Sequence, residues 1–218
     1  MKSHLALSTE PSEDMLKFLR YLEREFGRTF LNPLATVVDL GCGNGRNIRY
    51  LGETYGMRGI GYDISSEAVA QAAEASAGLP IRFEARSIAG IFDIPDKSQT
   101  LVLDMMASHF LSEKERTILH TEIARILKPD GWFFWKTFLR DEDRNAERLL
   151  KENPTNEQGT YLHPKIGAAE HVYSENELEA ILDRDFFVHK IYRSHNHLRN
   201  GHAFKRRSVS VYAQKIET

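Results

Sequence analysis

The sequence predicts an α/β protein in which helices cover both faces of a mostly parallel sheet. Between residues 36 and 138, short apolar runs alternate with longer segments of helical periodicity. Parallel strands need a crossover connection, usually a helix, and strands buried on both faces are apolar throughout. The length of 218 residues suits one domain with appendages, and such a chain buries enough surface to fold without disulfides or metals.

The expected elements follow one another in a regular order. A helix over residues 12–26 opens the chain, because Met15, Leu19 and Leu22 recur at helical spacing. We expect it to belong to an N-terminal helical cap, residues 1–30, of a single domain that spans residues 1–218. Strands are expected at residues 36–40, 58–63, 81–85, 100–105 and 131–138, and helices at 45–55, 66–77 and 112–127.

Three alternating glycines separate the first strand from the helix that follows it. Gly41, Gly43 and Gly45 come directly after the strand end at Asp39-Leu40. Because glycine has no Cβ atom, this turn lets a ligand lie against backbone amides at a helix N-terminus. The dinucleotide pattern Gly-x-Gly-x-x-Gly would need glycine where Arg46 stands, which disfavours a nicotinamide oxidoreductase.

Two further segments add to the glycine turn. Residues 59–65 read as a second strand with Asp63 at its carboxyl end, where a carboxylate can accept hydrogen bonds from both hydroxyls of a ribose. Residues 126–134 read as the end of a helix, a Pro-Gly turn and a fifth strand. Together, residues 30–138 resemble the class I S-adenosylmethionine (SAM) methyltransferases.

The resemblance implies a Rossmann-like methyltransferase fold, whose seven-stranded sheet has a sixth strand parallel to the first five and an antiparallel seventh. It implies SAM as cofactor and S-adenosylhomocysteine as product, with the glycine turn at the methionine end and Asp39 ordering the amino group. After strand three, Ser87 is expected to accept a hydrogen bond from adenine and Ile88 to pack on its ring. The predicted cofactor-binding residues are Asp39, Gly41, Cys42, Gly43, Gly45, Asp63, Ile64, Ser87, Ile88 and Asp104.

Candidate catalytic residues lie after the fourth strand. Methyl transfer is an in-line displacement whose leaving group belongs to the cofactor, so the protein aligns the acceptor and, for some acceptors, removes a proton. Asp104 and His109 are predicted to contact the substrate or to act as the base. The alternatives are that Asp104 accepts hydrogen bonds from loop amides and that His109 packs or caps at the next helix. Cys42 reads as a small packing residue rather than as a nucleophile.

Residues 139–173 break the alternation of strands and helices. They follow the fifth strand and therefore emerge at the carboxyl edge of the sheet, where ligands bind in open α/β sheets. We expect a lid-like insertion there. Ser174, with Glu177 three residues later, predicts a capping box that starts a helix through Leu182.

The chain ends in a predicted antiparallel hairpin, residues 186–216, which we call the ribbon. The ribbon contains seven Lys and Arg residues, four His residues and no acid, so the rest of the chain has a net charge of −9. Asn200-Gly201 favours a two-residue turn. With the turn centred there, strand alternation places on one face the basic residues His195, His197, Arg199 and Arg206.

This basic face is predicted to clamp an anionic substrate. The alternative is a solvated hairpin whose charges prevent aggregation at the sheet edge. A metal site is not expected, because the arginines would repel a cation and the segment offers no acid.

These observations predict a SAM-dependent methyltransferase that acts on a small polar or anionic molecule. One alternative is a nucleic-acid methyltransferase that uses the ribbon as a guide for the phosphate backbone, with steep salt dependence. Another is a non-catalytic SAM-binding module. The single cysteine, and the lack of a segment apolar enough for a signal peptide or a membrane span, make a cytoplasmic protein without a membrane partner the default expectation.

Overall fold

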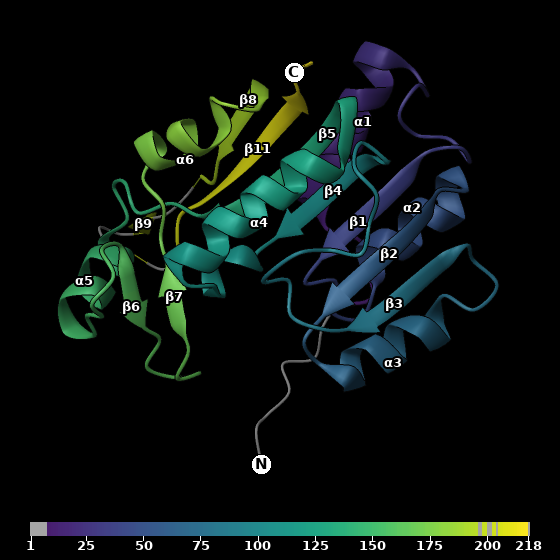
Figure 1. Cartoon of the computed structure of the whole chain (residues 1–218). Helices are drawn as coiled ribbons and strands as arrows, with labels where there is room; N and C mark the ends of the chain where they lie inside the picture. The colour runs from purple at the N-terminus through teal and green to yellow at the C-terminus, as the bar shows by residue number, and fades with distance from the viewer. Residues whose placement is uncertain (1–7, 196–197, 200–201, 204, 218) are drawn as a thin grey trace.

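A seven-stranded sheet forms the centre of the protein (Figure 1). The computed structural model describes residues 8–195, 198–199, 202–203 and 205–217, and within them the sheet has the strand order β3-β2-β1-β4-β5-β11-β8. β1 to β5 run parallel, and β11 is antiparallel to both of its neighbours. The predicted Rossmann-like fold is thus confirmed. The strands are β1 (Thr36–Leu40), β2 (Arg58–Asp63), β3 (Ile81–Ala85), β4 (Gln99–Met105), β5 (Leu127–Phe138), β8 (Phe186–Arg193) and β11 (Ser208–Lys215).

The parallel pairing brings the carboxyl ends of β1, β2 and β4 together. Leu40, the last residue of β1, lies opposite Tyr62 of β2 on one side and opposite Asp104 of β4 on the other. The turn that follows β1 is therefore flanked by the ends of two neighbouring strands, which is where ligands bind in this class of sheet.

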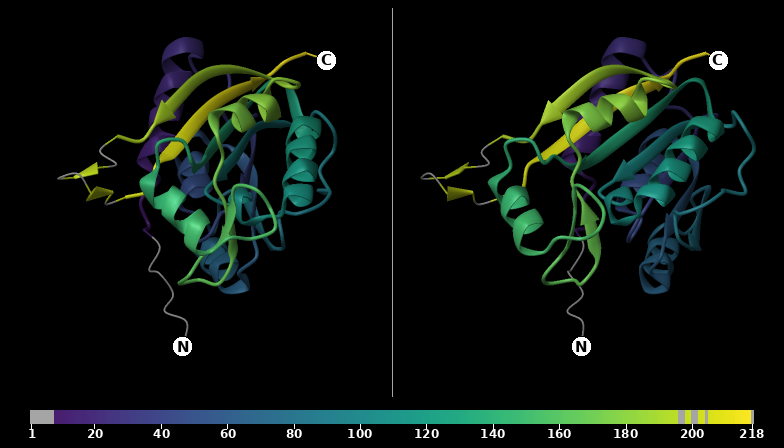
Figure 2. Two further views of the ribbon diagram at one scale, coloured as in Figure 1. Left: turned by 90° about the vertical axis from the view of Figure 1, so that its left-hand side faces the viewer. Right: turned by 60° about the vertical axis from the view of Figure 1, so that its left-hand side comes forward.

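Helices cover both faces of the sheet, as Figures 1 and 2 show. Successive strand residues point to opposite faces, so Val37 packs with α1 and α2 while Val38 packs with α4 and α6. On the first face, Phe18 stacks on Phe134 with ring centroids 5.0 Å apart. The helices are α1 (Glu13–Phe26), α2 (Arg46–Tyr55), α3 (Ser66–Ala75), α4 (Glu113–Ile126), α5 (Arg144–Glu152) and α6 (Glu175–Leu182), and η1 (Ser108–Phe110) is a short 3-10 helix.

Two elements differ from the expected ones. β5 begins at Leu127 rather than at residue 131, because Leu127 pairs with Gln99 before a bulge at which Asp130 has a φ of +61°. The insertion, residues 139–173, contains an antiparallel pair that the sequence analysis did not predict, formed by β6 (Thr160–Leu162) and β7 (Ala169–His171).

The ribbon is present, but its register shifts by one residue. At the tip, β9 (Leu198–Arg199) and β10 (His202–Ala203) pair as predicted, with Arg199 opposite His202. At the base, Val209 lies opposite Arg193, one residue out of step with the tip. The predicted pairing of His195 with Arg206 is therefore wrong, because the ladder is interrupted between tip and base. Among the residues that the prediction used, His197, Asn200, Gly201 and Phe204 lie outside the described residues.

Candidate functional site

The turn after β1 has the backbone geometry of a ligand cradle. Gly41 and Gly45 have φ angles of +69° and +74°, a region that favours glycine. A Cβ atom at Gly41 would lie 2.4 Å from the Cβ of Ala107, and one at Gly45 would lie 2.9 Å from the Cβ of Ala72. Both positions therefore require glycine, and the backbone of the turn stays bare toward a ligand.

Asp39 lies buried behind this turn, with 1 % of its surface exposed. Burial, together with the nearby carboxylates of Asp104 and Asp63, raises the pKa of Asp39 to about 7. Its Oδ2 atom is buried without a hydrogen-bond partner among the described residues. A buried oxygen of this kind is costly, and the ammonium group of bound SAM is a fitting donor for it.

Asp63, at the end of β2, supports the turn from the other side. Its two carboxylate oxygens accept hydrogen bonds from the amides of Gly43 (2.8 Å) and Ser65 (2.9 Å). Each oxygen keeps a second lone pair, so both can also accept hydrogen bonds from ribose hydroxyls.

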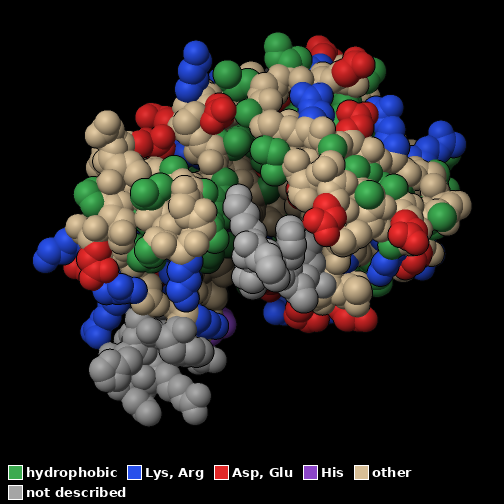
Figure 3. Space-filling view, turned by 90° about the horizontal axis from the view of Figure 1, so that it is seen from below, with side chains coloured by type: hydrophobic (Ala, Val, Ile, Leu, Met, Phe, Trp, Pro, Cys, Tyr) green, Lys and Arg blue, Asp and Glu red, His purple; other side chains and the backbone are tan. Residues whose placement is uncertain are grey.

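A cavity of about 570 Å³ lies over the turn, within the size range of small-molecule sites. Figure 3 views this edge of the sheet and shows the surface hollowed between two halves of the molecule. Of the predicted cofactor-binding residues, Gly41, Cys42, Gly43 and Asp63 line the cavity. The sequence analysis did not predict its other lining residues, Ser12, Asn44, Arg46, Asn47, Ser65, Glu67, Ala68, Gln71, Met105, Met106 and Lys136.

The sequence contains features that could have pointed to some of these additional lining residues. Arg46 and Asn47 directly follow the glycine turn at the start of α2, the end of a helix that binds anions. Met105 ends β4, and Lys136 lies opposite it near the carboxyl end of the parallel strand β5, so both reach the same edge. Met106 has a φ of +68°, an unusual value for a bulky residue and one that often marks a functional site.

The N-terminal segment of residues 8–12, which we call the strap, runs over the glycine turn. The Asn44 side chain donates to the carbonyl of Ser8 at 3.1 Å, and the amide of Ser12 donates to Oδ1 of Asn47 at 2.9 Å. The start of α2 therefore holds the strap and, with it, the start of α1 over the cavity.

Three of the predicted cofactor-binding residues, Ile64 and the two expected adenine contacts Ser87 and Ile88, lie outside the cavity lining. Ile64 is 82 % exposed beside Asp63. Ser87 is also exposed, and its hydroxyl accepts a hydrogen bond from the amide of Ala89 at 3.1 Å. Ile88 is buried within the core on the α4 side of the sheet and does not line the cavity.

The two candidate catalytic residues are buried below the cavity rather than in its lining. Asp104 accepts hydrogen bonds at 3.2 Å from the amides of Ala107 and Ser108, and burial raises its pKa to about 6. His109 packs against Phe138 with ring centroids 5.3 Å apart, and burial lowers the pKa of its imidazole to about 4. His109 is therefore neutral at pH 7.

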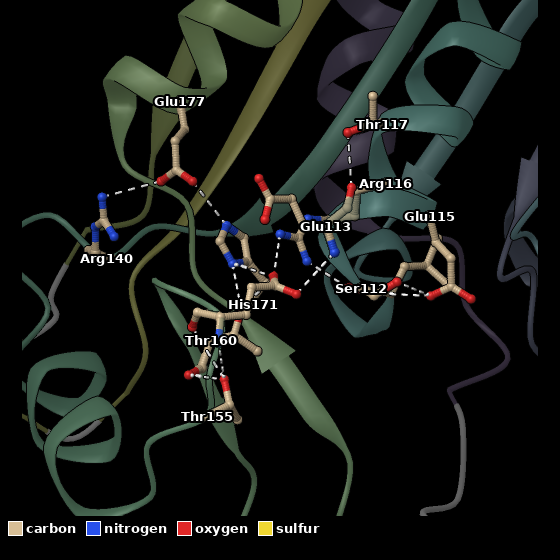
Figure 4. A network of polar contacts seen from close by, with 12 residues as sticks. Ser112, Glu113, Glu115, Arg116, Thr117, Arg140, Thr155, Thr160, His171 and Glu177 are labelled. Atoms are coloured by element: carbon tan, nitrogen blue, oxygen red, sulfur yellow. Dashed lines mark hydrogen bonds and ion pairs between the residues drawn. The ribbon is translucent and has the colours of Figure 1, made fainter.

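A polar network fastens the insertion to α4 and α6 (Figure 4). The buried Arg116 of α4 donates to Glu157 at 2.5 Å, and the Thr160 hydroxyl donates to the same carboxylate at 2.8 Å. His171 contacts Thr160 through Nδ1 at 2.8 Å and Glu177 through Nε2 at 3.2 Å. Burial raises the pKa of Glu177, but the contacts with His171 and the hydrogen bonds with Ser174 together outweigh it and hold the pKa at about 2.

Acids outside the ribbon pair with many of its cations. The Arg206 guanidinium lies 4.0 Å from the centroid of the Phe138 ring and pairs with Glu170 at 2.8 Å and with Asp143 at 3.5 Å. Further pairs join Arg193 to Glu175, Arg207 to Glu142 and Lys215 to Asp185. The charge segregation seen in the sequence is therefore largely balanced in space.

The predicted clamp residues are consequently spread out. Arg206 points into the insertion, and His195 is exposed after β8. The backbone of Arg199 belongs to β9 at the ribbon tip, which Figure 1 places on the side of the molecule away from α3 and Figure 2 shows projecting outward past α5. His197 lies outside the described residues.

Cys42 is the chain's single cysteine, and its side chain is buried. Burial and the nearby acids Asp39 and Asp63 raise the pKa of its thiol, so it stays protonated. In the described part of the chain, no three or more His, Cys, Asp or Glu side chains are grouped to hold a metal ion. No helix of that part combines the length and the apolar character needed to cross a bilayer.

Comparisons with known proteins match the central part of the chain to methyltransferases. Residues 37–131 match the family model of a methyltransferase domain. The chain is 28 % identical over 170 residues to 2-methyl-6-phytyl-1,4-hydroquinone methyltransferase of Synechocystis, covering 77 % of this chain and 52 % of that protein. It is 31 % identical over 123 residues to phosphoethanolamine N-methyltransferase of Plasmodium falciparum, covering 56 % of this chain and 46 % of that protein. The chain thus spans about half the length of these curated relatives.

Solved structures share the fold. A SAM-dependent methyltransferase of Methanosarcina mazei superimposes with a TM-score of 0.73 at 24 % identity, covering 88 % of this chain and 97 % of that chain. The 1,6-didemethyltoxoflavin-N1-methyltransferase of Burkholderia thailandensis, solved with bound S-adenosylhomocysteine, has a TM-score of 0.67 at 21 % identity, covering 94 % of this chain and 79 % of that chain. Residues 37–131 thus match a methyltransferase domain, and the chain shares its fold with these solved structures.

Proposed function

We propose that this chain transfers a methyl group from SAM to a small polar or anionic molecule. The observation that carries the proposal is the unpartnered, buried Oδ2 of Asp39 behind a glycine cradle. When bound, SAM supplies an electrophilic methyl group on a sulfonium sulfur. The turn at Gly41 to Gly45 would hold its methionine end, Asp39 its amino group and Asp63 its ribose hydroxyls.

The acceptor would lie beside the cofactor, toward Met106 and Lys136 at the ends of β4 and β5. The cavity volume of about 570 Å³ suits a cofactor together with a small acceptor. The names of two relatives, a hydroquinone methyltransferase and a phosphoethanolamine methyltransferase, support a small-molecule acceptor.

Asp104 and His109 fit a positioning role better than proton transfer. The Asp104 carboxylate fixes the segment that follows β4 by accepting two backbone hydrogen bonds. A histidine whose pKa is about 4 is a weak base at pH 7. We therefore propose that the protein mainly aligns the acceptor and excludes water.

The ribbon would be an auxiliary substrate clamp through His195, His197 and Arg199. Arg206 could join the clamp only by leaving Glu170 and Asp143, its partners in the insertion. These internal ion pairs also weigh against a nucleic-acid substrate, because paired cations gain less from binding phosphates.

Substitution of Asp63 tests the proposal. Asp63→Ala should weaken binding of S-adenosylhomocysteine by about tenfold or more, because a ribose hydrogen-bond acceptor is lost. Glu84→Ala, on β3 and outside the cavity lining, should leave it unchanged. Equal affinities of both variants and the wild type would contradict the ribose assignment.

Methyl-labelled SAM then distinguishes among the functions. Incubation with the small-molecule fraction of a cell extract should transfer label to a small molecule, and parallel incubation with total RNA should transfer none. Label in RNA would favour the nucleic-acid alternative, and binding without any transfer would favour a non-catalytic module.

A further inference from the structure

Among the residues that the structure describes, one lysine, Lys136, lines the cavity. Lys136 lies near the carboxyl end of β5, and its carbonyl accepts a hydrogen bond from the amide of Met106 at 2.9 Å. Its side chain lines the cavity together with Gly41, Met105 and Met106. This position is next to the glycine cradle and on the side where the acceptor would lie.

The Lys136 ammonium is paired with a carboxylate of α1. Nζ of Lys136 lies 2.5 Å from Oδ2 of Asp14, in the first turn of α1. The two side chains are 22 % and 33 % exposed, so water reaches both of them and screens the pair in part. Asp14 also forms an ion pair with Lys17, whose Nζ lies 3.5 Å from Oδ1 of Asp14. Asp14 can therefore leave Lys136 and keep a partner.

Four charged side chains of the described residues line the cavity. Asp63 and Glu67, at the end of β2 and the start of α3, are accompanied by Arg46 at the start of α2. Lys136 belongs to the opposite side, where the acceptor is expected. An anion placed there would be attracted by both the Lys136 ammonium and the sulfonium of SAM, whereas a cationic acceptor would be repelled by both.

We propose that Lys136 binds an anionic group of the methyl acceptor, a carboxylate or a phosphate, in exchange for Asp14. This inference rests on the proposed function and deepens it, because it assigns the acceptor a negative charge and Lys136 the role of a specificity-determining residue. Asp14 is then an internal competitor that occupies Lys136 until the acceptor binds. The exchange also releases the ion pair that joins the first turn of α1 to β5.

Calorimetric titration of the full chain saturated with S-adenosylhomocysteine tests the inference. The probes are two matched pairs, 4-hydroxybenzoate with its neutral methyl ester, and phosphoethanolamine with ethanolamine. The wild type should bind at least one anion more tightly than its counterpart. Lys136→Met should weaken the binding of that anion by about tenfold or more and leave the affinity for its counterpart unchanged. Asp14→Asn should bind the anion more tightly than the wild type does.

Lys114→Met, on the exposed start of α4, is the matched control and should change neither affinity. Wild-type protein that binds S-adenosylhomocysteine but prefers neither anion would overturn the inference and leave the proposed function intact. An anion affinity that survives Lys136→Met would do the same. Loss of S-adenosylhomocysteine binding in Lys136→Met would assign the lysine to the cofactor instead. Wild-type protein that does not bind S-adenosylhomocysteine would remove the proposed function as well.

Discussion

At the residue scale, Asp39 shows how a binding site opposes stability. The carboxylate is buried, near two other acids, and one of its oxygens has no partner among the described residues. Folding therefore favours its protonated form, whereas a cationic ligand group favours its ionised form. The free energy that ionised Asp39 costs the folded chain is recovered when a cation binds.

Asp39→Asn should stabilise the protein above neutral pH and weaken cofactor binding. The folded-state pKa is raised from 3.8 to about 7, so the folded state holds this proton more tightly than the unfolded state. The wild type consequently loses stability as the pH rises from about 4 to about 7, and the loss persists above pH 7. The variant escapes this loss and should be more stable than the wild type by roughly 1–3 kcal/mol at pH 8, and by much less at pH 4.

Thermal unfolding at a series of pH values measures this difference. Asp93→Asn, an exposed acid outside the cavity lining, is the control and should show no such pH-dependent gain. Calorimetry should find S-adenosylhomocysteine bound about tenfold or more weakly by Asp39→Asn. A variant that is no more stable at pH 8, or that binds as tightly as the wild type, would show that Asp39 does not have this role.

At the scale of elements, the two ends of the insertion, Leu139 and Tyr173, belong to the main core and bond to the backbone of the sheet domain, and between these ends ion pairs of its side chains join it to that domain. Arg116 of α4 is 7 % exposed and holds Glu157, while Arg206 of the ribbon holds Glu170. The insertion's own apolar cluster is small and includes Ala146, Leu149, Tyr161 and Val172. Segments with few buried apolar contacts open at low free energy, so these ion pairs would control how readily the insertion moves as a lid.

Glu157→Gln should loosen the insertion without unfolding the sheet. The substitution removes the charge that faces a buried guanidinium, which should cost about 1–3 kcal/mol. Hydrogen exchange should become faster over residues 153–173 and stay unchanged in β1 and β4.

Glu152→Gln provides the comparison, since Glu152 pairs with the exposed Arg148 at the end of α5, and it should leave exchange as in the wild type. Uniform acceleration across the whole chain in Glu157→Gln would show that the insertion unfolds together with the sheet, and not as a separate unit.

At the scale of the whole molecule, the sequence predicts what local patterns determine. The bounds of β1, β2 and β3 follow from apolar runs between turn residues, and Asp39 and Asp63 follow from their places at strand ends. Ion pairs between residues far apart in the sequence leave no local pattern from which they could be predicted. The Arg206–Glu170 pair spans 36 residues, and it turns a cation that looked free in the ribbon into a partner of the insertion. Lys136 likewise meets Asp14 across 122 residues.

The central claim is that the glycine cradle and its two acids hold SAM, and calorimetric titration of the chain with S-adenosylhomocysteine tests it most directly. One molecule should bind per chain, and the affinity should fall in both Asp39→Asn and Asp63→Ala while Glu84→Ala matches the wild type. Absence of binding by the folded wild type, or affinities that neither acid changes, would contradict the account.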